Sequence, residues 1–149
     1  MLPTMRRHQG LARQTLLQAE AILIRGGELE VVDLEDIRAR LIVQLGAYTE
    51  FKHSTVFPEL MASTDQVVAS LAGQMKSRCD QMAAFYRRYI TEWPISRVIE
   101  QRALYRGVAL DVVGRLRRHF VREDADVVRL TERPAEYAKG PWLRSMTDT

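Results

Sequence analysis

The residues of this chain best suited to chemistry are a histidine and a glutamate about one helical turn apart. His119 and Glu123 are four positions apart in a segment with helical apolar spacing, so their side chains point from neighbouring turns toward one spot. This spacing lets a helix offer an imidazole and a carboxylate to one metal ion. The same spacing also suits a simple ion pair, and the two residues alone leave both interpretations open.

The neighbouring residues favour an inward position for this pair. Val112 and Leu116 precede His119 on the same apolar stripe. A buried carboxylate without a partner is costly, so Glu123 predicts a metal, a cation or a hydrogen-bond network beside it. His8, which we place on the inward stripe of the first helix, adds a second imidazole from a different segment.

Two further side chains can act as ligands. Tyr48 as a phenolate suits ferric iron, and Cys79 as a thiolate suits a softer metal. Each also has a plainer interpretation, because Tyr48 can simply pack in a core and a buried cysteine behaves as a small hydrophobe. Cys79 is the one cysteine, so an internal disulfide is excluded, and no paired Cys/His spacing typical of a structural zinc site is present.

The elements that must position these residues are predicted to be helices. The chain has 149 residues with 8 Gly and 5 Pro, too few breakers for a many-stranded β architecture. Gly26-Gly27 is expected to end the first helix, Asp33 to cap the second, and Thr64 or Asp65 to cap the third. The predicted helices cover residues 5–24, 33–60, 65–92 and 95–130.

Each predicted helix carries one apolar stripe, and four such stripes must be buried against one another. With short connections, the simplest all-α solution is an antiparallel up-down four-helix bundle. We predict this bundle over residues 1–131, followed by an irregular C-terminal tail over 132–149. Tyr137 and Trp142 in the tail can dock on the bundle or pair two copies as a homodimer.

Three segments of the chain resemble the hemerythrin-like (HHE cation-binding) family. MRRHQGLARQTLL at residues 5–17 is similar to the first-helix motif, and YTEFKHSTVFPEL at 48–60 shares the Phe-Pro-x-Leu ending of the second helix. HFVREDADVVRL at 119–130 resembles the last helix. The resemblance spans residues 5–130 in order, and it implies a bundle around a non-haem di-iron centre that binds oxygen, senses oxygen or redox state, or handles iron.

Carried over to this chain, the resemblance leaves the ligand set incomplete. His8, His119 and Glu123 match ligand positions, whereas the second-helix histidine and glutamate fall at Tyr48 and Lys52. The third helix has no histidine, and its ligand position lies near Arg78 or Cys79.

A di-iron site needs several carboxylates to offset two cations, but here an ammonium replaces one of them. We expect Lys52 to substitute internally for the metal's charge by pairing with Glu123. His53, next to Lys52, would need a local rotation to reach the centre and is a marginal ligand.

These features predict a non-enzymatic regulatory or interaction module with a degenerate di-iron site and an unknown protein partner. The alternative is a partial site of His8, His119 and Glu123, with Tyr48 or Cys79, that binds non-haem iron or zinc as an oxygen or redox sensor or an iron-handling protein. An enzyme is not predicted, because no glycine-rich phosphate loop or nucleophile arrangement is recognisable.

The charge balance adds a second alternative, a basic helical nucleic-acid-binding protein. Lys and Arg number 22 against 19 Asp and Glu, for a formal net charge of +3, and 19 of the 22 are arginine. Nucleic acid is disfavoured because the arginines are interleaved with acids and form no basic run or aromatic platform. No signal peptide and no stretch of about 18 apolar residues is recognisable, which predicts a cytoplasmic protein without a membrane partner.

Overall fold

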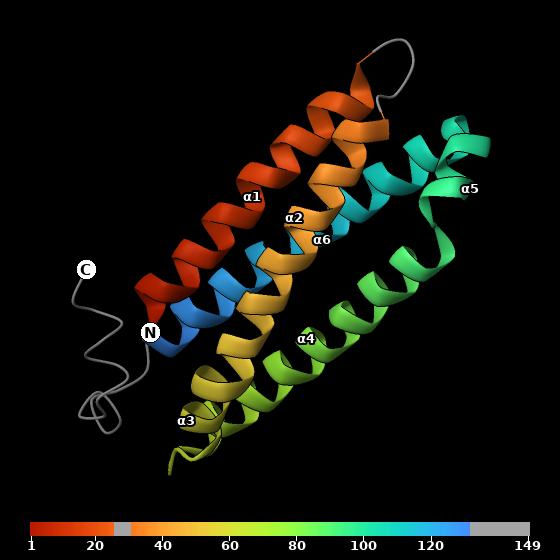
Figure 1. Cartoon of the computed structure of the whole chain (residues 1–149). Coiled ribbons are helices and arrows are strands. Elements are labelled where there is room, and N and C mark those ends of the chain that lie inside the picture. The colour runs from red at the N-terminus through yellow and green to blue at the C-terminus, as the bar shows by residue number, and fades with distance from the viewer. Residues whose placement is uncertain (26–30, 132–149) are drawn as a thin grey trace.

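The computed structural model describes residues 1–25 and 31–131, and these are helical apart from short connections (Figure 1). No β-strand occurs in these two ranges, which confirms the all-α prediction. The predicted stop at Gly26-Gly27 and the predicted tail with Tyr137 and Trp142 lie outside the described residues.

Four helices of more than twenty residues dominate the described chain. In Figure 1, α1 leads away from the N-terminus, α2 returns beside it, α4 leads away again, and α6 returns toward the start of α1. α1 packs against α2 and α6, and α4 packs against α3 and α6. The elements are α1 Leu2–Ile24, α2 Val31–Phe51, η1 Lys52–Val56, α3 Phe57–Met61, α4 Gln66–Glu92, α5 Ile95–Glu100 and α6 Arg102–Thr131.

The buried face of α1 is rotated relative to the predicted stripe. The fully buried side chains include Met5, Gln9, Ala12 and Leu16, at alternating spacings of three and four residues. His8, which we placed on the inward stripe, is only partly buried, and Leu11 is 48% exposed. The helix begins at Leu2, and the apolar residues Leu2 and Met5 belong to the buried series that brings Gln9, and not His8, to the core.

The second predicted helix is interrupted by one π-helical turn before its proline. The backbone N–H of Phe57 donates to the carbonyl of Lys52, five residues earlier. Pro58 then follows in the first turn of α3, where its missing N–H is tolerated. The π turn buries Lys52 and Val56.

The predicted cap at Asp33 was wrong, because α2 already begins at Val31 and Asp33 lies in its first turn.

The third helix begins and ends where the sequence indicates. Asp65 is its N-cap, and Asp65 Oδ1 accepts a hydrogen bond from the Val67 N–H at 2.9 Å.

The fourth predicted helix is not continuous, because Gln101 breaks it into α5 and α6. The short α5 packs on both α2 and α6 and fully buries Val98, so tertiary packing, without a local Gly or Pro, sets this break.

Removing the cap at Asp65 tests the start of α4. We expect Asp65→Ala to lower the free energy of unfolding by about 1 kcal/mol, because the first turn loses a side-chain acceptor. Asp65→Asn, which keeps an acceptor oxygen, should retain most of the stability. Urea unfolding of the three proteins measures both differences, and equal stability of the alanine and wild-type proteins would show that the cap is energetically neutral.

Candidate functional site

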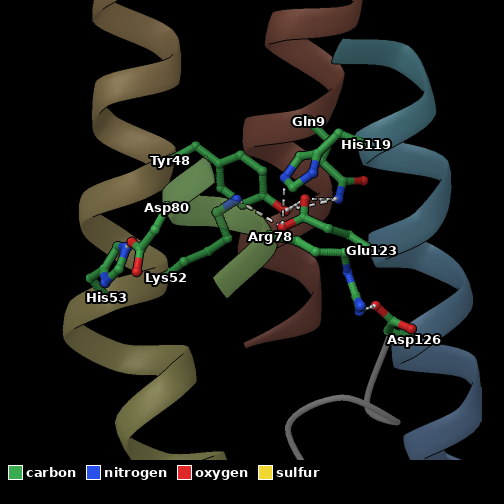
Figure 2. Close-up of polar contacts among 9 residues, drawn as sticks. All are labelled: Gln9, Tyr48, Lys52, His53, Arg78, Asp80, His119, Glu123 and Asp126. Carbon is green, nitrogen blue, oxygen red and sulfur yellow. Dashed lines mark hydrogen bonds and ion pairs between the residues drawn. The ribbon is translucent and has the colours of Figure 1, made fainter. Parts of the chain in front are cut away.

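Four elements bring polar side chains together inside the helical assembly (Figure 2). Gln9 comes from α1, Tyr48 from α2, Lys52 from η1 and Glu123 from α6. All four residues are at most 3% exposed. Buried polar groups must find partners within the protein, so the contacts among these residues are decisive.

The carboxylate of Glu123 is the centre of the cluster. Lys52 Nζ donates to Glu123 Oε2 at 2.8 Å, and Tyr48 Oη donates to Glu123 Oε1 at 2.9 Å. Gln9 Nε2 donates to Tyr48 Oη at 2.8 Å and lies 3.4 Å from Glu123 Oε1. Each carboxylate oxygen therefore has a donor, and the structure brings Lys52 and Glu123 together as a buried ion pair.

Two further contacts enclose the ion pair. His119 Nε2 lies 3.5 Å from Glu123 Oε2, and the His119 side chain is 8% exposed. Lys52 Nζ lies 4.0 Å from the centroid of the Tyr48 ring. The ammonium thus contacts both a carboxylate and the face of an aromatic ring, and both contacts attract a positive charge.

The pKa of Glu123 records this environment. Burial alone would raise the pKa of the carboxyl group, but the hydrogen bond from His119 and the charge of Lys52 outweigh it and lower the pKa to about 2. Burial and the neighbouring charge of Glu123 raise the pKa of Tyr48. The cluster therefore holds a charged carboxylate and a neutral phenol, whose O–H donates a hydrogen bond to that carboxylate.

His8 does not join this hydrogen-bond network within the described part of the chain. Its ring stacks on Tyr48 and Phe51, with centroid distances of 5.4 Å and 5.6 Å. Burial, with the charges of Arg7 and Lys52, lowers the pKa of His8. The imidazole therefore covers the outer side of Tyr48 because α1 directs Gln9, one residue later, into the core.

Cys79 and His53 occupy different surroundings. Cys79 on α4 is buried and lines a cavity of about 30 Å³ together with Lys52 and His119. Burial raises the pKa of its thiol, and Lys52 offsets part of that rise. His53 points away from the centre, with its Nε2 3.0 Å from Asp80 Oδ1 on α4 (Figure 2). The π turn presents Lys52, and not His53, to the interior.

The predicted ligands do not form a metal-binding set. In residues 1–25 and 31–131, no group of three or more His, Cys, Asp or Glu side chains is placed to hold a metal ion. Glu123 already accepts a hydrogen bond from the Lys52 ammonium, and the adjacent cavity has room for about one or two water molecules. The donor set therefore does not fit a di-iron centre, which requires several carboxylates free to bind.

A second buried acid lies on α6 and was not predicted from the sequence. Asp126 is 1% exposed and binds Arg78 from α4, with Arg122 and Arg129 within 4 Å of its other oxygen. This contact ties α4 to α6 beside the central cluster (Figure 2). A usable signal was the spacing, because Asp126 follows Glu123 by three residues and so shares its side of the helix. Gln9 was not predicted, because nothing in the local sequence shows whether it or the adjacent His8 faces the core.

Comparison with known proteins assigns no family. No family model matches the chain, and neither the curated proteins nor the solved structures contain a significant match. The resemblance to the hemerythrin-like family therefore stays a prediction. Among the described helices, none combines the length and the apolar character needed to cross a membrane.

Separating the two members of the ion pair tests its energetics. We expect Glu123→Leu to lower the free energy of unfolding by about 3 to 5 kcal/mol, because it leaves the Lys52 ammonium buried without its carboxylate. The double variant Lys52→Met/Glu123→Leu should recover most of that loss, since both charges are removed together. Chemical denaturation of Glu123→Leu, Lys52→Met and the double variant measures the coupling free energy between the two side chains.

The exposed pair Asp36 and Arg40 provides the matched control. Their charged atoms approach to 3.1 Å, but the side chain of Asp36 is 66% exposed and that of Arg40 is 42% exposed. Asp36→Ala should therefore cost about 0.5 kcal/mol or less. A loss of stability in the double variant equal to the sum of the two single losses would contradict a direct interaction between Lys52 and Glu123.

The lowered pKa of Glu123 also predicts a pH dependence. A carboxyl group whose pKa is lower in the folded than in the unfolded state stabilises the fold above its unfolded pKa, and this contribution is lost as the pH falls. We expect the loss between about pH 5 and pH 2, from the unfolded pKa down to the folded one. Denaturation at a series of pH values should show that Lys52→Met/Glu123→Leu loses less stability at acid pH than the wild-type protein. Identical pH profiles of the two proteins would contradict this prediction.

Proposed function

We propose that this chain is a hemerythrin-like antiparallel four-helix bundle in which a buried ion pair takes the place of a metal centre. In this proposal the protein is a non-enzymatic regulatory or interaction module. The observation that carries it is the 2.8 Å contact between Lys52 Nζ and Glu123 Oε2, with both side chains 3% exposed. In this proposal the ammonium of Lys52 takes the place that a metal ion has in the resembled family.

The order and packing of the helices support the bundle. α1 contacts α2 and α6, and α4 contacts α6, which are three of the four neighbour contacts of an up-down arrangement, and α3 joins α2 to α4 at the fourth side. Gln9, Tyr48 and Glu123 come from three of these helices and meet at one point, as ligands do in bundle cofactor sites. The cluster lies between helices, as bundle cofactor sites do, and its contacts are those of a buried ion pair.

Electrostatics explain why a divalent cation would compete poorly at this site. A metal ion bound to Glu123 would lie next to the Lys52 ammonium, and two cations repel strongly in a buried, low-dielectric site. Displacing Lys52 would leave its ammonium buried without a carboxylate. The ion pair and a metal ion are therefore alternatives for the same carboxylate.

The role as an interaction module is supported by the nature of the central residues. Glu123 is held as a carboxylate by four neighbours, and the phenol of Tyr48 is committed to it as a donor. The cavity beside them, about 30 Å³, is too small for an organic substrate. Such a cluster orients helices and leaves the outer surfaces of the bundle for recognition.

Elemental analysis of the protein produced with iron and zinc supplied tests this proposal against the metal-dependent alternative. We expect no stoichiometric metal in the wild-type protein. The double variant Lys52→Glu/Tyr48→His, which restores the ligand types of the resembled family, should bind more metal because it replaces a cation by a carboxylate and adds an imidazole.

The variant Asp36→Ala serves as a control, since it alters an exposed carboxylate far from the central cluster in sequence. Stoichiometric metal in the wild-type protein that disappears in His119→Ala and in His8→Ala would overturn the proposal in favour of a metal-binding oxygen or redox sensor. Failure of the double variant to bind metal would contradict the assignment of Tyr48 and Lys52 to former ligand positions.

A further inference from the structure

A surface groove of about 460 Å³ between α4 and α6 is lined by arginines. Its lining contains no aspartate or glutamate. Met82 and Phe85 from α4 contribute apolar surface, and both are partly buried against the core. The arginines of the lining are Arg78, Arg88, Arg115, Arg118 and Arg122.

The nearby carboxylates neutralise only part of this charge. Arg78 binds the buried Asp126, and Arg115 Nε lies 3.0 Å from Asp111 Oδ2. Arg88 and Arg118 are exposed, and neither has a carboxylate partner among the described residues. The groove therefore keeps surplus positive charge that an anion from outside the chain can meet.

The charges are spread along the groove. Arg78 and Arg88 are ten residues apart on α4, a rise of about 15 Å at 1.5 Å per residue. The Arg115 guanidinium lies 4.7 Å from the centroid of the Phe85 ring, which holds one arginine against the apolar part of the lining. Charges distributed over this length, around an apolar middle, suit an elongated ligand better than a compact anion.

We infer that this groove binds an acidic amphipathic segment of a partner protein. This inference names the partner chemistry of the proposed interaction module and rests on that proposal. Carboxylates of the segment would pair with the guanidinium groups, for which bidentate geometry is favourable. Apolar side chains of the same segment would pack on Met82 and Phe85. A nucleic acid would use the charge but not this apolar surface.

Fluorescence anisotropy with the full chain tests the inference. The probe is a labelled peptide of about 16 residues with a repeating Glu-Glu-Leu-Leu sequence, long enough to cover the groove as a helix. We expect it to bind at low salt, and Arg88→Glu/Arg118→Glu should weaken binding by about tenfold or more. A peptide with serine in place of leucine should bind more weakly than the leucine peptide.

The double variant Arg6→Glu/Arg7→Glu is the matched control, because it makes the same change in net charge at exposed positions on α1. It should change binding by less than about threefold at physiological salt. Since all four arginines are exposed, thermal unfolding should show that both double variants keep their fold.

Any of four results would overturn the inference. The first two are equal weakening of leucine-peptide binding by both double variants and no binding by the wild-type protein. The other two are binding of single-stranded DNA of the same charge, or of the serine peptide, as tightly as the leucine peptide, which would assign the groove to polyanions. Absence of peptide binding would overturn this inference but not the proposed function, which the metal content tests separately. Stoichiometric metal would overturn the proposed function whether or not the peptide binds.

Discussion

One buried ion pair constrains how the helices meet at their centre, because neither of its charges can be left there alone. Two unit charges removed from water are stable only when each finds its partner and further hydrogen bonds. Lys52 and Glu123 meet this condition because Tyr48 and Gln9 satisfy the second carboxylate oxygen. Residues from α1, α2, η1 and α6 must therefore stay in register for the charges to remain paired. The ion pair thus constrains how these helices are placed relative to one another.

The local backbone serves this constraint. The π turn, closed by a hydrogen bond from the Phe57 N–H to the Lys52 carbonyl, holds Lys52 in the interior. If Lys52 pointed outward, the buried Glu123 would lose its cation. On α6, Asp126 adds a second buried carboxylate, which Arg78 binds from α4. The two acids, three residues apart, anchor α6 to partners on different elements. Ordinary apolar packing surrounds both contacts and supplies most of the buried surface.

The sequence predicts the elements better than their rotation. Helix type followed from apolar spacing, and the ends of α4 followed from Asp65 and Trp93-Pro94, because caps and breakers are local signals. The inward direction of Gln9 in place of His8 could not be read locally, since adjacent stripes on α1 differ by about 100° and tertiary packing chooses between them. The break at Gln101 has no local Gly or Pro and also depends on packing. Glu123 and Lys52 were found because a buried charge requires a partner.

The central claim is that an internal ammonium occupies the place of a metal ion. A crystal structure determined from protein grown and crystallised with iron and zinc tests this most directly, with anomalous scattering recorded for both elements. The account predicts Lys52 Nζ within hydrogen-bond distance of Glu123 and no anomalous peak in the cluster. An anomalous peak coordinated by His119 and Glu123, with Lys52 turned away from the carboxylate, would contradict it.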